Sequence, residues 1–437
     1  MTTSILVNIS LVFGFFCNSI NSFFNIYIFF ISIILFRKNL ITFKFINKNI
    51  VFSLFIIISS NIIFHIFTSS EEVFFPITDY FYIFTAISFA YYLTNKKFLD
   101  SFVIFAWRIG IIMWIVYIFL YIRGFSLGLE NLTLGASFYS KLMNGALSQM
   151  NMATNGLIFK PLISIIFLIP LVLYIYSSND LKKKLIFCPV IKNKFIRILS
   201  IIFFTFLIPS RSLTVGLISL YLFDFVFKIN YKNSKFLIQF FSLTIPSLFL
   251  SLLLSLNLLV KRIPELIAID YRSSVWLESI DFLKSNPLSF FVGPGYSQVD
   301  NLVGGNLAKN LELQEFIQNI FNQIELDHIS RLYATSSNEN LLGFESDFVN
   351  GIFGYGLIPV FLITSFLFYR CLCIIFLNID KGVYLYHETH RTFGRIMLPL
   401  LIGLLFEDRL PYLIIWVLLF TLISIPKKKL VNLYNEN

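Results

Sequence analysis

The chain has 437 residues, of which 57% are hydrophobic and 13% are charged, and its net charge is +10. Soluble globular proteins carry about 25% charged residues, so this composition excludes a chain whose whole surface faces water. The positive charge does not indicate a nucleic-acid-binding protein. The basic residues stand in short clusters between apolar blocks, without a basic aromatic platform or a groove-entering element.

Apolar blocks recur along the whole chain, and a membrane-spanning helix needs roughly 20 such residues. The blocks predict spans at Ile5–Cys17, Phe23–Phe36, Val51–Phe67, Ile77–Leu93, Phe102–Tyr121, Leu162–Tyr176, Ile196–Pro209, Leu213–Phe227, Phe236–Val260, Phe348–Tyr369, Ile396–Phe406 and Pro411–Ile425. The first two blocks form either two helices or one long one. Counted as two, they predict an all-α polytopic membrane protein with about 12 transmembrane helices.

The loops between these spans alternate in charge, and the positive-inside rule assigns the basic loops to the cytoplasm. The basic loops contain Arg37/Lys38/Lys44/Lys48, Lys96/Lys97, Lys182–Lys184 with Lys192/Lys194, Lys228/Lys232/Lys235, Arg370/Lys381/Arg391 and Lys427–Lys429. The opposite loops then face outward. This pattern predicts an amino-terminal bundle over residues 1–260, a large outer loop over 261–346 and carboxy-terminal helices over 347–437.

The large outer loop is predicted to be partly helical. Loops beyond about 12–15 residues are usually functional or disordered. In this loop, apolar residues recur at helical spacing in Tyr271–Leu283 and again in Leu313–Ile324. The second of these helices either packs onto the bundle or lies on the membrane surface.

The sequence predicts no metal site and no cofactor. His387-Glu388-Thr389-His390 misses the zinc-protease spacing, because the second histidine would have to stand where Arg391 is, and we interpret the segment as a solvated turn. We expect Cys371 and Cys373 to pack at an inner helix end. Among ionisable residues within the spans, Asp224 lies one helical turn before Lys228 and is predicted to pair with it.

Arginines and carboxylates converge on the predicted outer face. Arg211 stands between two apolar blocks, and Glu345-Ser346-Asp347 closes the large loop. The loop itself adds Lys261, Arg262, Arg272, His328 and Arg331. Guanidinium groups bind phosphate bidentately, and a carboxylate beside them can take a proton from a sugar hydroxyl. Alternatively, the arginines only neutralise the carboxylates or bind ordinary lipid phosphates.

Four short motifs, in order, resemble the O-antigen ligase and O-antigen polymerase (Wzy-type) superfamily. They are Ser210-Arg211-Ser212, Arg272-Ser273-Ser274-Val275-Trp276, Asn286-Pro287-Leu288 with Gly293-Pro294-Gly295, and Glu345-Ser346-Asp347-Phe348 with Tyr355-Gly356-Leu357. Phe291 stands where the family usually has glycine. Glu345 stands where the ligases carry histidine, so the chain looks more like a polymerase.

The resemblance implies a GT-C-like bundle and a multi-pass protein of the bacterial inner membrane. It implies that the protein joins undecaprenyl-pyrophosphate-linked repeat units at the periplasmic face by inverting, metal-independent glycosyl transfer. Arg211 and Arg272 would grip the pyrophosphate, with Lys261, Arg262, Arg331 and His328 as further substrate-binding candidates. Glu345, or as second choice Asp347, would activate the acceptor hydroxyl. Lipid-linked glycans, the bilayer and a chain-length regulator protein are the implied partners.

Three rival functions stay open. A ligase that moves finished glycan to lipid A core would need a histidine at position 345, where this chain has Glu345. A flippase or transporter would lack a large ordered outer loop, and it should show polar midplane residues or broken helices. A peptidoglycan polymerase of the SEDS type is similar in helix number, but its motifs are not seen in this sequence.

Overall fold

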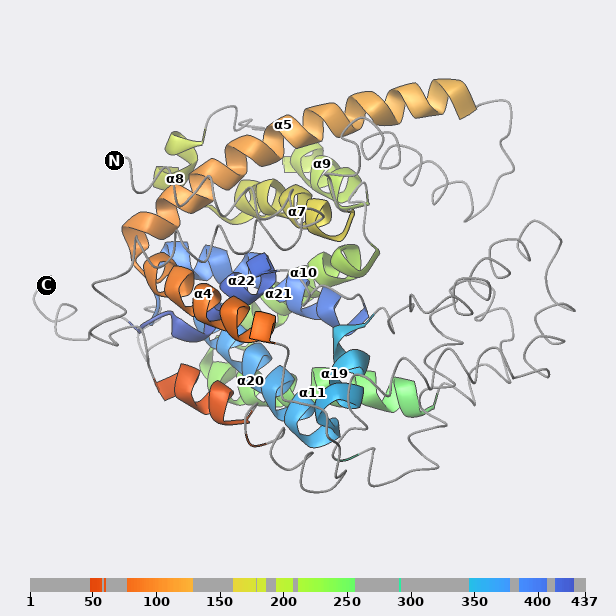
Figure 1. The fold of residues 1–437 in the computed structure, drawn as a ribbon. Helices are drawn as coiled ribbons and strands as arrows, with labels where there is room; N and C mark the ends of the chain where they lie inside the picture. Colours follow the sequence, from red (N-terminus) through yellow and green to blue (C-terminus); the bar gives the residue numbers. More distant parts are fainter. Residues whose placement is uncertain are drawn as a thin grey trace, which may run out of the picture.

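The computed structural model describes residues 48–56, 59, 77–128, 160–177, 179–185, 194–206, 211–255, 291, 346–377, 385–406 and 413–427. Within these ranges every secondary-structure element is a helix, and the helices gather into one bundle (Figure 1). The first two apolar blocks and both predicted loop helices lie outside the described residues. Whether the amino end forms one span or two therefore stays a prediction.

The helices fall on the predicted apolar blocks. They are α4 (Ile77–Leu93), α5 (Lys96–Gly128), α7 (Lys160–Tyr176), α8 (Asn179–Lys184), α9 (Lys194–Phe206), α10 (Arg211–Ile229), η3 (Tyr231–Asn233), α11 (Ser234–Leu254), α19 (Asp347–Tyr355), α20 (Leu357–Phe376), α21 (Glu388–Phe406) and α22 (Leu413–Ser424). However, α5 extends beyond the predicted span Phe102–Tyr121 at both ends, and α21 begins eight residues before Ile396 (396 − 388). A further helical segment covers residues 48–56. Four stretches in the described part are long and apolar enough to cross a membrane: Lys96–Ile115, Ser212–Ile229, Ser234–Leu254 and Leu357–Phe376.

The outward surface of the bundle is strongly apolar. The side chains of Phe195, Phe236 and Leu248 are 73%, 65% and 63% exposed, among many others of their kind. Soluble monomers rarely leave contiguous apolar surface of this extent, whereas a bilayer covers it with lipid chains. Together with the four long apolar helices, this surface identifies a helical membrane protein.

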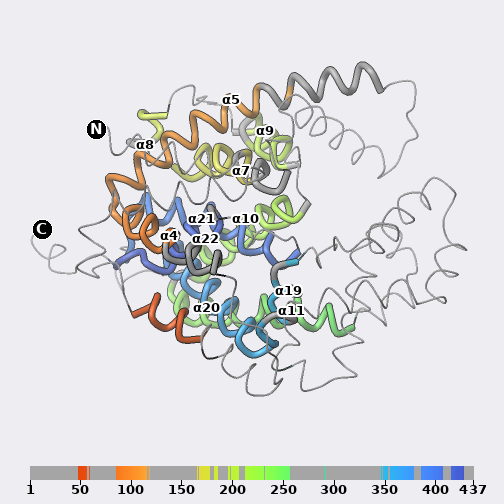
Figure 2. The backbone as a smooth tube through the Cα atoms, viewed as in Figure 1, coloured from red at the N-terminus to blue at the C-terminus, as the bar shows by residue number. Residues whose placement is uncertain are grey.

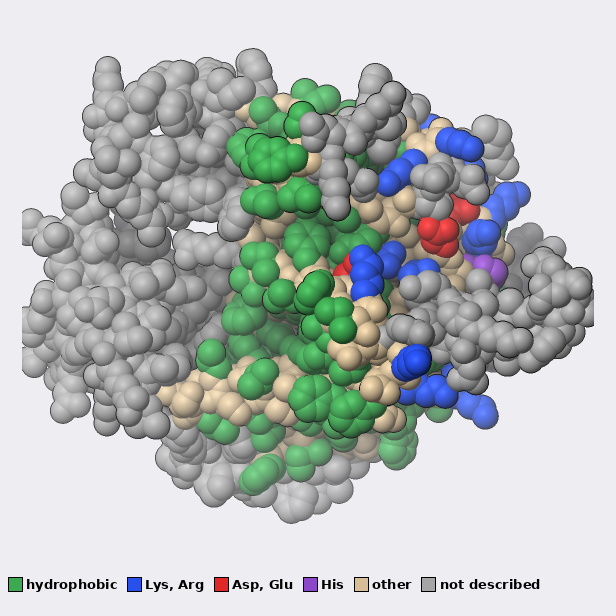
Figure 3. Space-filling model, turned by 180° about the vertical axis from the view of Figure 1, so that it is seen from behind, with side chains coloured by type: hydrophobic (Ala, Val, Ile, Leu, Met, Phe, Trp, Pro, Cys, Tyr) green, Lys and Arg blue, Asp and Glu red, His purple; other side chains and the backbone are tan. Residues whose placement is uncertain are grey.

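Lysine and arginine side chains gather at one end of the apolar surface (Figure 3). We call this the basic end. The exposed lysines of the described residues are Lys48, Lys96, Lys97, Lys183, Lys184, Lys228, Lys232, Lys235 and Lys427. The alternation of charge along the sequence therefore corresponds to a separation of charge in space.

Helix α21 is the centre of the bundle. It packs against α10, α20, α7, α19 and α5, and every residue from Thr392 to Leu405 is buried. Its closest neighbour is α10: a Cβ atom on Gly216 would lie 2.6 Å from the Cα of Pro399. Only a residue without a side chain allows this approach of the two backbones.

The predicted span Phe348–Tyr369 is broken. Helix α19 ends at Tyr355 and α20 begins at Leu357, with Gly356 between them at φ 86° and ψ 163°. This positive φ favours glycine, because it has no Cβ atom to clash with the backbone. Hydropathy could not detect the break, since both flanks are apolar.

The interpretation of His387–His390 as a solvated turn was wrong. Helix α21 begins at Glu388, and Thr389 and His390 are only 6% and 2% exposed. Thr389 Oγ1 donates to Asp100 Oδ1 at 2.6 Å, and His390 Nε2 lies 3.2 Å from the carbonyl oxygen of Thr94. These polar side chains are buried because other helices supply their hydrogen-bond partners.

Two arginines assigned to a connecting loop also lie within helices. Arg370 is buried in α20 and donates to the carbonyl oxygens of Ile423 and Ile425 at the end of α22, at 3.1 and 2.9 Å. Arg391 lies in α21 and donates to the carbonyl oxygen of Ile375 at 3.1 Å. The last carbonyls of a helix lack intrahelical partners and attract cations, which explains both positions. By contrast, the predicted packing of Cys371 is confirmed: it is buried, and its Sγ lies 3.2 Å from the carbonyl oxygen of Gly394.

Candidate functional site

Two helices that carry predicted site residues begin beside the end of α21. Helix α10 begins at Arg211 and α19 begins at Asp347, and both helices pack against α21 (Figure 2). The side chains of Arg211 and Asp347 are not described, so the structure fixes where these residues sit but not what they contact. We call the region formed by these two helix starts and the end of α21 the rim.

The buried hydroxyl of Ser346 fixes the start of α19. Ser346 Oγ donates to the carbonyl oxygen of Leu405 at 2.6 Å and accepts from the backbone N–H of Val349 at 3.3 Å. It therefore caps α19 and joins it to the last turn of α21. The middle residue of the predicted Glu345-Ser346-Asp347 motif therefore has a structural role. The sequence already offered a signal for it, because serine is a common residue at the start of a helix, where it accepts from the amide three residues later.

The contact between Gly216 and Pro399 sets the height of the other helix start. Arg211 lies five residues beyond Gly216 towards the rim, which is about 7.5 Å along α10. Leu405 lies six residues beyond Pro399, which is about 9 Å along α21. Arg211 and the joint between Ser346 and Leu405 therefore stand at nearly the same level of the bundle.

Helix ends of both signs meet at the rim. Helices α10 and α19 begin there, each with roughly half a positive charge, and α21 ends there with roughly half a negative charge. Helix α10 begins with Arg211 and α19 with Asp347, so the start of α10 is the positive part of the rim. The rim lies at the far end of the bundle from the basic end, because α10 runs from Arg211 to Lys228.

The other predicted site residues lie outside the described residues. They are Glu345, Arg272, Lys261, Arg262, His328 and Arg331. The structure neither brings them together nor separates them, and their roles stay predictions. In the described part of the chain, no group of three or more His, Cys, Asp or Glu residues is arranged to hold a metal ion.

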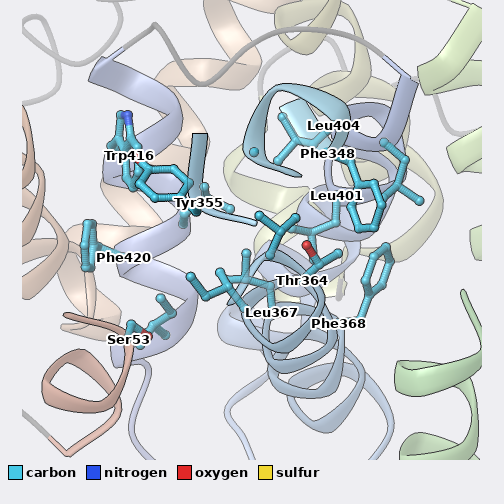
Figure 4. A pocket seen from close by; sticks show the side chains of 16 residues that line it. Ser53, Phe348, Tyr355, Thr364, Leu367, Phe368, Leu401, Leu404, Trp416 and Phe420 are labelled. Atoms are coloured by element: carbon cyan, nitrogen blue, oxygen red, sulfur yellow. The ribbon is translucent and has the colours of Figure 1, made fainter. Parts of the chain in front are cut away.

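An apolar cavity lies between α19, α20, α21, α22 and the segment 48–56 (Figure 4). Its volume is about 120 Å³. It is lined by Ser53, Phe348, Gly351, Tyr355, Val360, Ile363, Thr364, Leu367, Phe368, Leu401, Leu404, Leu405, Trp416, Leu419, Phe420 and Ile423. The α19 residues of this lining follow directly after Asp347, so the cavity adjoins the rim. An apolar cavity of 150 Å³ holds a benzene-sized molecule, so this one suits a short piece of hydrocarbon chain.

The predicted pair of Asp224 and Lys228 is confirmed, with Lys228 Nζ 2.6 Å from Asp224 Oδ2. The sequence reading missed a third member, Arg395 of α21, whose Nη2 lies 3.7 Å from Asp224 Oδ1. The sequence did contain an indication of this third charge, because Arg395 directly precedes the predicted span Ile396–Phe406. These charges lie on the basic-end side of the contact between Gly216 and Pro399, so they are separate from the rim.

The chain has no match among the family models, the curated proteins or the solved structures with which it was compared. The fold and the surface define a helical membrane protein. Beyond that class, any function rests on the motifs in the sequence and on the geometry of the rim.

Proposed function

We propose that the protein is a glycosyltransferase that lengthens a polysaccharide by joining lipid-linked repeat units at the rim. The donor is a glycan on a polyprenyl pyrophosphate, and the acceptor is a second lipid-linked unit. Undecaprenyl pyrophosphate is the carrier that the motif resemblance implies. The reaction occurs on the outer face of the bacterial inner membrane, opposite the basic end.

The reaction needs one base and a binding site for the leaving pyrophosphate. Glu345, or alternatively Asp347, removes the proton from an acceptor hydroxyl. The hydroxyl oxygen bonds to the anomeric carbon of the donor sugar, and the bond from this carbon to the pyrophosphate oxygen breaks with inversion. Arg211 and Arg272 bind the pyrophosphate as its charge develops. Lys261, Arg262, His328 and Arg331 are the further candidates for substrate contact.

One observation carries the proposal: α10 and α19, which hold residues from two separate motifs, start at the same level on either side of α21. Positions 211 and 347 are 136 residues apart in sequence (347 − 211), and the alternation of loop charges puts both on the outer face without making their helices neighbours of one third helix. The cavity beside α19 adds an apolar space next to the rim, as a substrate with a pyrophosphate and a hydrocarbon chain requires.

Complementation of a deletion strain tests the proposal. We expect Arg211→Ala and Glu345→Gln to abolish chain lengthening, so that single repeat units accumulate, while Glu345→Asp retains part of it. Arg211→Lys should also be damaging, because a point charge does not replace a guanidinium fork. Arg108→Ala, an exposed arginine of α5 away from the rim, is the matched control. Full-length polysaccharide from Arg211→Ala at normal protein level would refute the pyrophosphate assignment.

The break at Gly356 favours a second candidate, a flippase for lipid-linked oligosaccharides, because transporters use interrupted helices at their substrate sites. The same deletion strain separates the functions. Loss of a flippase leaves lipid-linked units on the cytoplasmic face, whereas loss of a polymerase leaves single units that have already crossed. A ligase differs again, since its loss leaves no repeat units on lipid A.

A further inference from the structure

A buried arginine near the basic end has a guanidinium nitrogen without a hydrogen-bond partner. Arg395 is only 9% exposed, and its guanidinium carbon lies 4.4 Å from the ring centre of Tyr176 in α7. Its Nε atom is buried without a hydrogen-bond partner. Among the described residues, the carboxylate paired with it is that of Asp224, whose Oδ1 stands 3.7 Å from Nη2, beyond the 3.2 Å limit of an ordinary N–H···O bond.

The charges around Arg395 do not balance. Asp224 provides one negative charge, and it is held by Lys228 at 2.6 Å. Among the described residues, two cations face this one carboxylate, a net charge of +1 (2 − 1). The side chain of Lys228 is 75% exposed, whereas those of Asp224 and Arg395 are only 13% and 11% exposed, so the buried part of the cluster is the loose pair of Arg395 and Asp224. A buried guanidinium nitrogen without a hydrogen-bond partner is costly, and an anion with free acceptor oxygens would remove the cost.

The cluster lies near the ends of the helices that carry it, on the side of the basic end. Arg395 is seven residues from the first residue of α21, which is about 10 Å along the helix. Lys228 is the next-to-last residue of α10, and its side chain is 75% exposed. A bilayer has about 5–7 Å of headgroup region on each side of its hydrocarbon core. With the start of α21 at the outer edge of that region, Arg395 lies just inside the core and Lys228 points to the headgroups.

We propose that Arg395 and Lys228 form a binding site for a singly charged phosphate group, the phosphodiester of a membrane phospholipid, at the basic end of α7, α10 and α21. One phosphodiester charge balances the cluster, and its oxygens accept from the guanidinium, which binds phosphates in this way. Pockets of this kind, basic and between transmembrane helices, recognise lipid headgroups. The site is separate from the rim and does not depend on the proposed glycosyl transfer.

Thermal unfolding of the full-length protein, purified in a non-ionic detergent and stripped of lipid, tests the site. Three probes are titrated: phosphatidylglycerol, the diacylglycerol with the same chains, and inorganic phosphate. We expect phosphatidylglycerol to raise the unfolding midpoint and diacylglycerol to leave it unchanged. If only inorganic phosphate raises the unfolding midpoint, the cluster binds a soluble phosphate rather than a lipid headgroup. No rise with either phosphate compound would overturn the proposal.

Three variants decide whether the cluster binds the anion. Arg395→Gln and Lys228→Gln should each weaken the apparent affinity about tenfold or more, because each removes charged hydrogen bonds. Asp224→Asn should strengthen it, because it removes the competing negative charge. Lys232→Gln, an exposed lysine at the same end, is the control and should keep wild-type affinity.

The sign of the Asp224→Asn effect separates binding from a purely structural ion pair. A structural pair would lose stability in Asp224→Asn and gain nothing from added lipid, and that result would refute the site. If Arg395→Gln does not fold, the exposed position of Lys228 keeps the test decisive, since its substitution leaves the core intact.

Discussion

Replacing Gly216 with alanine tests whether the contact between α10 and α21 holds the rim together. The new Cβ atom would lie 2.6 Å from Pro399 Cα and 2.7 Å from its carbonyl oxygen. Ordinary carbon contacts are 3.5–4.0 Å, so α10 must move outward by about 1 Å. The obstacle is backbone, which cannot rotate away as a side chain does.

Two effects of the substitution oppose each other. Overpacking of a core costs about 1–3 kcal/mol, and the backbone contact puts Gly216→Ala at the upper end of that range. Alanine is about 1 kcal/mol more favourable than glycine within a helix. The expected net loss is therefore about 2 kcal/mol. For a cooperative unit of this length, such a loss lowers the unfolding midpoint by about 2 °C.

Fluorescence-detected unfolding in detergent measures this shift. Leu222→Ala is the control on the lipid-facing side of α10, where the side chain is 60% exposed. Gly351→Ala is a graded comparison, because its Cβ atom would meet only a side-chain methyl of Val360, at 2.9 Å. A Gly216→Ala protein as stable as wild type would refute the close contact and, with it, the common height of the two helix starts.

Three further predictions concern buried polar groups. Ser346→Ala should cost about 2 kcal/mol, because it removes the cap of α19 and its bond to Leu405, and an unchanged midpoint would contradict the joint. Arg370→Met should cost at least about 2 kcal/mol and increase hydrogen exchange in the last turn of α22, whose carbonyls it satisfies. Burial lowers the pKa of His390 to about 4, so the histidine is neutral in the folded protein. Stability should be complete above the unfolded-state pKa of about 6.5 and fall by at most about 3 kcal/mol as the pH drops to 4. His390→Gln should flatten this slope and His387→Gln should keep it; equal slopes in both variants would exclude His390 as the cause.

Helix positions were predictable wherever apolar length alone determines them. Helix α4 has the predicted bounds, Ile77–Leu93, and α7, α10 and α22 differ from prediction by at most two residues at each end. A lipid-facing helix must be apolar along its length, so its sequence contains the whole signal. All-helical architecture follows from the same rule, because a bilayer gives backbone groups no other partners.

The basic-end half of α21 was not predictable in this way. Its polar residues meet other helices rather than water: Thr389 donates to Asp100 of α5, and Arg395 lies against Tyr176 of α7 and Asp224 of α10. A single sequence does not say which distant helix will lie beside each of them. Only part of the rim could be predicted from the sequence. Arg211 and Asp347 were identified from motifs, whereas the serine joint that fixes the start of α19 depends on a carbonyl 59 residues away.

The burial of α21 has a consequence for how the chain enters the membrane. The apolar part of α21, Ile396–Phe406, is 11 residues long, well short of the roughly 20 that span a bilayer, and Arg391 and Arg395 precede it. By itself, α21 is therefore a poor candidate for independent insertion. Its partners α5, α7, α10 and α20 all precede it in the chain, so they have been synthesised when α21 emerges. We infer that α21 inserts against helices that are already in place, where Arg395 pairs with Asp224 of α10.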